Sequence, residues 1–167
     1  MSRPIRILIV EDRPTTVMAI RESLEQTGYM ICGDAADYES AIALMKRESP
    51  DLALVDIGLK GQPDGIVTAQ ELIRIKPIPL LYLTIHTDDA TYNRARQTNP
   101  AAFLHKPFRV RELAMQIDLV MHNYYQGHSS DFASIAEINE SHQTGLPGTS
   151  DYLYLSDHTS KFRIHIS

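Results

Sequence analysis

The 167-residue sequence predicts an α/β fold in which helices cover both faces of a five-stranded parallel sheet. Short apolar runs alternate regularly with longer segments that carry apolar residues at helical spacing. Five strands and five helices alternate in this way over residues 1–125, which is the pattern of successive β-α-β units. Because crossovers between parallel strands are right-handed, helices on both faces complete a doubly wound sandwich.

The first strand and helix are the most regular pair. Residues 5–10 (IRILIV) are apolar except for one arginine, which predicts a buried strand. Residues 16–28 carry Val17, Ile20 and Leu24 at helical spacing and end at a glycine, which is a common helix stop. The chain therefore begins with a β-α unit.

The second and third pairs have similar lengths. A short strand is predicted over 29–35 and a helix over 37–49, with Asp37 as its N-cap. The run 52–57 (LALVDI) predicts the third strand, and a helix is expected over 64–76. The third strand is unusual, because its apolar run leads directly into an aspartate.

The last two pairs complete the sheet. Strands are predicted over 79–84 and, more briefly, over 101–105. The helix expected between them, 88–98, has only a thin apolar stripe, whereas 109–125 is a regular amphipathic helix. A thin stripe suits an element that shifts rather than one that anchors the core.

Composition and charge exclude several classes of protein. The chain is 43% hydrophobic and 22% charged, as in an ordinary globular domain. Its net charge is −5 with no basic run, which argues against nucleic-acid binding by this chain alone. Cys32 is the single cysteine, which excludes an intrachain disulfide and a thiolate zinc cluster and fits a reducing compartment. No segment approaches the roughly 20 apolar residues of a membrane span, and MSRPIRILIV is too short for a signal peptide, so we expect a cytoplasmic protein.

Polar side chains stand where four of the predicted strands end. Glu11 and Asp12 follow the first strand, and Asp56 comes near the end of the third. Thr84 ends the fourth strand and Lys106 follows the fifth. Each has an ordinary explanation by itself, since acidic pairs cap helices, threonine favours strands and a Lys-Pro pair makes a turn. In a doubly wound sheet, however, the carboxyl ends of the strands form the ligand-binding edge, and all five residues are expected there.

These residues, in this order, resemble the receiver domain of two-component response regulators. The resemblance covers about residues 4–125 and implies a flavodoxin-like sheet with strand order 2-1-3-4-5. The motifs that carry it are Glu11-Asp12, GDAAD over 33–37, Asp56, Asp64-Gly65, Thr84 and Lys106-Pro107-Phe108.

The resemblance implies a signalling phosphoacceptor and not an enzyme with a separate substrate. Asp56 would accept a phosphoryl group from a sensor histidine kinase in a reaction that requires Mg²⁺. The domain would promote its own phosphotransfer and dephosphorylation. Asp12 and Asp56 would be side-chain ligands of the metal. Gly58 would offer its backbone carbonyl, and Glu11 would act through a water molecule.

The resemblance also implies how the signal is passed on. Thr84 and Lys106 would contact the phosphoryl oxygens. After phosphorylation Thr84 would move toward the phosphate, and Phe103, at the position of the switch aromatic, would turn inward. A cis peptide bond before Pro107 would aim the Lys106 ammonium into the pocket.

The residue types suit this chemistry. Mg²⁺ prefers oxygen ligands and keeps several waters, so one or two carboxylates are enough to hold it. The metal and the Lys106 ammonium would keep Asp56 ionised. Together with Thr84 they would stabilise charge on the phosphoryl oxygens. A carboxylate nucleophile forms an acyl phosphate, whose reactivity suits a transient signal.

Three local features bear on the site. The loop between Asp56 and Asp64 is one residue longer than in the commonest receivers, and we expect an intact site with a longer loop. His86, two residues after Thr84, either tunes the lifetime of the phosphate or is an ordinary surface histidine. His105 is expected to point away from the pocket, because side chains alternate along a strand.

The residues beyond 125 have a different character. The segment 126–150 is polar, as a linker is, although a short helix is possible over 131–138. Residues 151–167 hold two alternating runs around a polar turn, which predicts a β-hairpin, and a hairpin alone is only marginally stable. This segment resembles the first strands of a LytTR-type DNA-binding domain, which would make it the truncated start of an output domain. The alternative is an extension that packs on the receiver or exchanges with a second copy.

A homodimer is also expected after phosphorylation. The surface formed by helix 88–98, with the strand and helix that follow it, would be remodelled by the switch. Arg94 and Arg96 would then pair with Asp88, Asp89 and acidic residues of the last helix across a two-fold axis.

The residues at the strand ends are compatible to different degrees with three classes of function. A phosphorylation-switched module acting in transcription regulation uses every residue named above. A phosphatase with an aspartyl nucleophile needs a second acid two residues after it, and that position is Gly58. A receiver-shaped interaction module that is never phosphorylated would have no need of the complete set of acids, Thr84 and Lys106.

Overall fold

The computed structural model describes residues 3–85, 88–136, 152–157 and 160–165, with side-chain environments up to residue 127. The chain divides into two compact units, Met1–Ser129 and Ser130–Ser167, which are described separately. Among the described residues, no helix combines the length and the apolar character needed to cross a bilayer.

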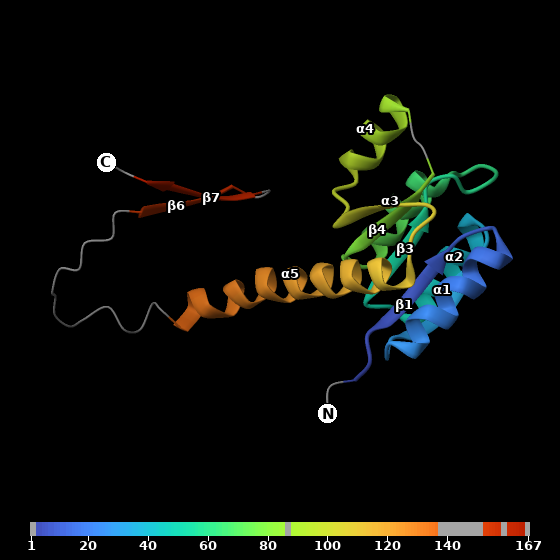
Figure 1. The fold of residues 1–167 in the computed structure, drawn as a ribbon, viewed down its shortest axis with the longest axis horizontal. Helices are drawn as coiled ribbons and strands as arrows, with labels where there is room; N and C mark the ends of the chain where they lie inside the picture. The colour runs from blue at the N-terminus through green and yellow to red at the C-terminus, as the bar shows by residue number, and fades with distance from the viewer. Residues whose placement is uncertain (1–2, 86–87, 137–151, 158–159, 166–167) are drawn as a thin grey trace, which may run out of the picture. The chain divides into compact units, whose positions relative to one another are not determined.

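The first unit is built on a five-stranded sheet in which every neighbouring pair is parallel (Figure 1). Its strand order, β2-β1-β3-β4-β5, confirms the predicted fold class and order. The strands are β1 (Arg6–Val10), β2 (Met30–Ala35), β3 (Leu52–Asp56), β4 (Leu80–Thr84) and β5 (Ala102–His105). In this order β1 and β3 are adjacent at the centre, so residues at their carboxyl ends are neighbours in space.

Five helices connect and follow the strands. They are α1 (Pro14–Gln26), α2 (Tyr38–Glu48), α3 (Gly65–Ile75), α4 (Asp89–Gln97) and α5 (Val110–Ala136). Three of them begin at an aspartate N-cap whose carboxylate accepts a backbone N–H of the first turn: Asp37 for α2, Asp64 for α3 and Asp88 for α4. The first four helices start and end within two residues of their predicted limits.

The helices form two layers with a separate core on each face of the sheet (Figure 1). Alternate residues of each strand serve the two cores, so that Leu8 and Val10 pack with α2, α3 and α4. Ile7 and Ile9 point to the opposite face and pack with α1 and α5. Helix α4 contributes a single buried residue, Ala95, to its core, as its thin apolar stripe predicts.

Helix α5 differs from its predicted length. It continues to Ala136, so the predicted helix end at 125 is wrong and the first part of the segment 126–150 is helical. The physical reason is that nothing after 125 stops a helix firmly: Gly127 costs only about 1 kcal/mol relative to alanine inside a helix. The rest of the predicted linker, 137–150, lies outside the described residues.

The second unit contains the predicted hairpin. Strands β6 (Tyr152–Asp157) and β7 (Ser160–His165) pair antiparallel, with Tyr152 opposite His165 and Asp157 opposite Ser160. The period-two pattern of the sequence therefore identified both strands.

Candidate functional site

The residues expected at the ligand-binding edge meet there. Glu11 and Asp12 directly follow β1, and Asp56 is the last residue of β3. Thr84 is the last residue of β4, and Lys106 directly follows β5. All of these strands are parallel, so their carboxyl ends lie at one edge of the sheet.

Successive side chains of a strand point to opposite faces of the sheet, and this alternation divides the edge residues between the two faces. The residue two positions before each of Glu11, Asp56 and Lys106 belongs to the core under α1 and α5. The residue two positions before Thr84 belongs to the core under α2, α3 and α4. Strand alternation therefore assigns Glu11, Asp56 and Lys106 to one side of the sheet and Thr84 to the other.

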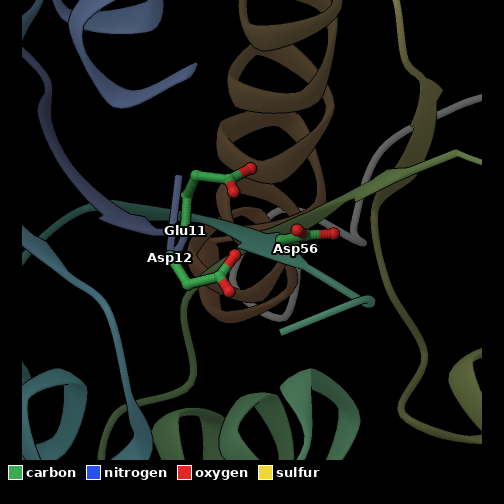
Figure 2. Close-up of side chains that lie close together, drawn as sticks. All are labelled: Glu11, Asp12 and Asp56. Atoms are coloured by element: carbon green, nitrogen blue, oxygen red, sulfur yellow. The ribbon is translucent and has the colours of Figure 1, made fainter. Parts of the chain in front are cut away.

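Three carboxylates gather at the ends of β1 and β3 (Figure 2). Oxygen atoms of Glu11, Asp12 and Asp56 all lie within 4.8 Å of one another. Glu11 and Asp56 are buried, with exposed fractions of 2% and 5%, whereas Asp12 is partly open to solvent. Mg²⁺ binds oxygen ligands and keeps several of its waters, and a partly open carboxylate leaves a route for water to the cluster. The donor set therefore fits this ion.

Lys106 is the cation of the cluster. Its Nζ lies 3.0 Å from Asp56 Oδ2 and also forms an ion pair with Glu11. Lys60 is more weakly placed, with its Nζ 3.9 Å from Asp12 Oδ2 and its side chain 81% exposed. Three carboxylates near one partly buried ammonium leave an excess of negative charge, which a divalent cation would neutralise.

Glu11 is held by two donors in addition to its burial. Its Oε1 accepts the backbone N–H of Arg13 at 3.0 Å, and its other oxygen contacts Lys106. Burial raises the pKa of the Glu11 carboxyl and the nearby Asp56 charge raises it further, while Lys106 and the Arg13 N–H act in the opposite direction. The net effect is a raised pKa, because desolvation is the largest contribution.

The backbone around Asp56 is closely fitted. Asp56 Oδ1 accepts the N–H of Gly58 at 2.9 Å, so this residue's amide already contacts the carboxylate; the role of the Gly58 carbonyl as a metal ligand stays a prediction. A Cβ on Gly65 would lie 1.9 Å from the carbonyl oxygen of Asp56, so the start of α3 packs directly against the end of β3. The importance of this close approach was missed, although a glycine directly after an N-cap aspartate is the signal that could have revealed it.

Thr84 carries a buried hydroxyl that has no hydrogen-bond partner among the described residues. The residue is 2% exposed. A buried polar group without a partner costs about 1–3 kcal/mol, and such a group calls for a functional explanation. Its position at the end of β4, next to the strand that carries Asp56, makes it available to an oxygen atom bound there.

Phe103 lies in an aromatic cluster beneath α4. Its ring centroid is 5.5 Å from that of Tyr82 and 5.0 Å from that of Tyr92 on α4. Tyr82 is fully buried and its hydroxyl is 2.9 Å from the Oγ1 of Thr98, at the end of α4. Burial raises the pKa of Tyr82 to about 12. Sequence reasoning identified Phe103 but missed Tyr82, which is an ordinary strand residue in the sequence pattern.

The remaining predictions near the site have mixed outcomes. The peptide bond between Lys106 and Pro107 is cis, as predicted, and a second cis bond, between Gln62 and Pro63, was not predicted. His105 is exposed, with its Nδ1 3.4 Å from the carbonyl oxygen of Ile85, and its orientation away from the pocket stays a prediction. His86 lies outside the described residues.

Fold and site together define a doubly wound α/β protein with a cluster of three carboxylates beside a partly buried lysine. The response regulator receiver domain matches residues 7–118, and the chain belongs to that family. Among solved structures it is similar to the receiver domain of a modulated diguanylate cyclase from Desulfovibrio desulfuricans G20. The TM-score is 0.71 with 33% identity, and the match covers 74% of this chain and 98% of that one.

Curated relatives agree with the family. The transcriptional regulatory protein PdtaR of Mycobacterium tuberculosis H37Rv is 33% identical over 121 residues, which are 72% of this chain and 58% of that protein. The phosphate regulon transcriptional regulatory protein PhoB of Escherichia coli K12 is 34% identical over 119 residues, covering 70% of this chain and 51% of that protein. The chain thus spans little more than half the length of these two relatives. Protein CcdB of Bacillus subtilis, 30% identical over 117 residues, is matched over 97% of its length.

Proposed function

We propose that Asp56 accepts a phosphoryl group from a sensor histidine kinase, in the presence of Mg²⁺, and that this modification switches an output. The observation that carries the proposal is the combination of a buried carboxylate, a lysine 3.0 Å from it and a buried threonine hydroxyl without a partner among the described residues. Transfer of a phosphoryl group to a carboxylate needs an acceptor, a cation and a hydroxyl donor close together, and this edge of the sheet provides all three.

The acidic residues would hold the cation. Asp12 and Asp56 would bind it through their side chains, Gly58 through its carbonyl, and Glu11 through a water molecule. When bound, Mg²⁺ supplies positive charge for the transferred phosphoryl oxygens.

The protein groups act on the phosphoryl group directly. A carboxylate oxygen of Asp56 forms the new bond to phosphorus, while the bond from phosphorus to the donor breaks and the donor keeps the electron pair. Lys106 and Thr84 each donate a hydrogen bond to the phosphoryl oxygens, which offsets the charge of these oxygens. The product is an acyl phosphate that water later hydrolyses, so the domain is a signalling acceptor and not an enzyme with a separate substrate.

We also propose that the output of the switch is the regulation of transcription. Two relatives are named transcriptional regulatory proteins, which supports a role in transcription regulation through an output domain that contacts DNA. The β6–β7 hairpin is compatible with the start of a LytTR-type domain. We propose a cytoplasmic location and a homodimer formed through α4, β5 and α5.

A receiver that acts without phosphorylation is the second candidate. The match of this chain to nearly the whole length of Protein CcdB supports the idea that a receiver unit can stand alone. An aspartyl phosphatase gains no support, because Gly58 occupies the position where such an enzyme needs its second acid.

Phosphorylation by a small phosphodonor tests the proposal. Wild type incubated with acetyl phosphate and Mg²⁺ should gain the mass of one phosphoryl group, and removal of Mg²⁺ by a chelator should prevent the gain. Asp56→Asn should remain unmodified while keeping the fold, since the change is nearly isosteric. Equal incorporation in wild type and Asp56→Asn would refute the assignment, and no incorporation in wild type would favour the phosphorylation-independent module.

A further inference from the structure

Helix α4 is attached to the rest of the first unit by a small number of side chains. Ala95 is the only buried residue of this helix. One ion pair reaches it from another element: Arg94 Nη2 donates to Asp64 Oδ2 at 2.9 Å. Two further contacts involve α4 and its C-cap, Tyr92 with Phe103 and Thr98 with Tyr82. With so little apolar burial, the position of α4 depends strongly on these polar and aromatic contacts.

Asp64 connects α4 to the start of α3. Its Oδ1 accepts the N–H of Val67 at 2.9 Å and caps α3, while its Oδ2 accepts from Arg94. Burial alone would raise the pKa of Asp64, but the Val67 N–H and the Arg94 guanidinium outweigh it and lower the pKa below 3.8. The carboxylate is therefore charged at neutral pH, as an ion pair with Arg94 requires.

The start of α3 is fixed in turn against the phosphoacceptor. Gly65, the residue after Asp64, lies so close to Asp56 that a Cβ on it would be 1.9 Å from the Asp56 carbonyl oxygen. Tightly packed backbones of this kind move together. The main chain of Asp56, the first turn of α3 and Arg94 of α4 therefore form one continuous set of contacts.

We propose that the Asp64–Arg94 ion pair is a latch that holds α4 in the position described here and thereby favours the unphosphorylated state, with Arg94 as a positioning residue for the acceptor. The inference rests on the proposed function, since it concerns how modification of Asp56 is coupled to α4. Coupling between two sites is reciprocal. If a phosphoryl group on Asp56 favours a displaced α4, release of α4 must favour the phosphoryl group by the same factor.

The test measures the affinity for beryllium trifluoride, an analogue of the phosphoryl group, in the presence of Mg²⁺. Arg94→Gln should bind it about two- to fivefold more tightly than wild type, the range that a partly exposed ion pair can supply. An increase in affinity would be informative, because loss of the Arg94 charge would by itself weaken the binding of an anion. Titration calorimetry at concentrations where the protein is monomeric gives the affinities.

A double-mutant cycle identifies the pair. Asp64→Asn keeps an N-cap for α3, since asparagine caps as well as aspartate, but removes the charge that binds Arg94. The double variant Asp64→Asn/Arg94→Gln should bind the analogue no more tightly than the tighter single variant, because the ion pair can be broken only once. Additive effects of the two changes would overturn the latch.

Arg96→Gln is the matched control. Arg96 is exposed on the same helix, and its side chain forms no hydrogen bond or ion pair within the described part of the chain, so Arg96→Gln should leave the affinity unchanged or slightly lower. An Arg94→Gln affinity equal to or weaker than that of wild type would overturn the latch, even if the variant unfolds at a lower temperature, since that would show a merely structural role. Failure of wild type itself to bind the analogue would instead contradict the proposed function.

Discussion

At the scale of single residues, the hydroxyl of Thr84 is expected to serve the proposed phosphoryl contact at a cost in the stability of the fold. Its hydroxyl is buried without a partner among the described residues. Thr84→Val removes that hydroxyl while keeping the branched shape, so the free energy of unfolding should stay the same or rise, by up to about 3 kcal/mol. The variant should bind beryllium trifluoride more weakly, because one donor to the phosphoryl oxygens is lost. Urea unfolding and calorimetry measure the two effects.

Asp12, in the acidic cluster, provides a control for the Thr84 variant. Asp12→Ala should weaken Mg²⁺ binding, since it deletes one of the two proposed side-chain ligands, whereas Thr84→Val should leave Mg²⁺ affinity nearly unchanged. Equal weakening of Mg²⁺ binding by both changes would show that the division of roles is wrong. Destabilisation by Thr84→Val would show that the hydroxyl has a partner in the folded protein.

Gly65 is a position where the packing of α3 against β3 leaves no room for a side chain. Gly65→Ala would place a Cβ 1.9 Å from the Asp56 carbonyl oxygen, so the start of α3 must move away from β3. Overpacking of this kind should lower the free energy of unfolding by about 1–3 kcal/mol and slow phosphorylation of Asp56. Gly58→Ala is the control for stability, since its Cβ would meet Asp56 Oδ1 at an ordinary 3.5 Å. Equal losses of stability in both variants would contradict the close-approach argument.

At the scale of elements, Asp51 joins the chain before β1 to the start of β3. Its carboxylate binds the Arg3 guanidinium at 2.7 and 2.9 Å and accepts the N–H of Arg6 at 2.9 Å. Burial raises the pKa of Asp51, but these partners lower it overall, below 3.8. The contribution to stability is therefore fully present above pH 3.8 and is lost as the pH falls through the lower folded-state pKa.

Asp51→Asn should reveal this contribution. The variant should be less stable than wild type near neutral pH, and the difference in free energy of unfolding should shrink when the pH falls below 3.8. Urea unfolding of both proteins over the acid range measures the difference. A difference that is independent of pH would mean that the charge of Asp51 does not stabilise the fold.

Local sequence patterns were sufficient to predict most elements but not the contacts between them. Apolar periodicity and aspartate caps determine where a strand or helix begins, and these signals lie within a few residues of one another. The edge residues, too, were predictable, because parallel topology alone brings the strand ends together. The pairing of Asp64 with Arg94 was not predictable, since it depends on how α4 is oriented over α3. The length of α5 was missed for a different reason: a single glycine is only a weak stop.

At the scale of the whole molecule, α5 offers an apolar surface for a second copy. Met115 and Leu119 are exposed on neighbouring turns of this helix, Leu119 to 55%. Of the two arginines expected to pair across a dimer axis, Arg94 is already bound to Asp64, which leaves Arg96 as the available one. The proposed dimer therefore combines apolar contacts of α5 with charges of α4, and release of Arg94 on activation would add a further cation.

Sedimentation with beryllium trifluoride and Mg²⁺ tests the dimer. The mass of wild type should rise from that of a monomer toward that of a dimer at micromolar concentrations. Leu119→Asp should prevent the rise, because a buried carboxylate at the interface would lack a partner. Its affinity for the analogue should equal that of wild type when both proteins are measured as monomers. Met18→Asp is the control, since Met18 is also exposed, at 69%, but belongs to α1, which is not part of the proposed interface of α4, β5 and α5. If Met18→Asp prevents the rise and Leu119→Asp does not, the dimer forms through α1. If wild type keeps its monomer mass throughout, the segment beyond α5 becomes the better candidate for contact with a partner.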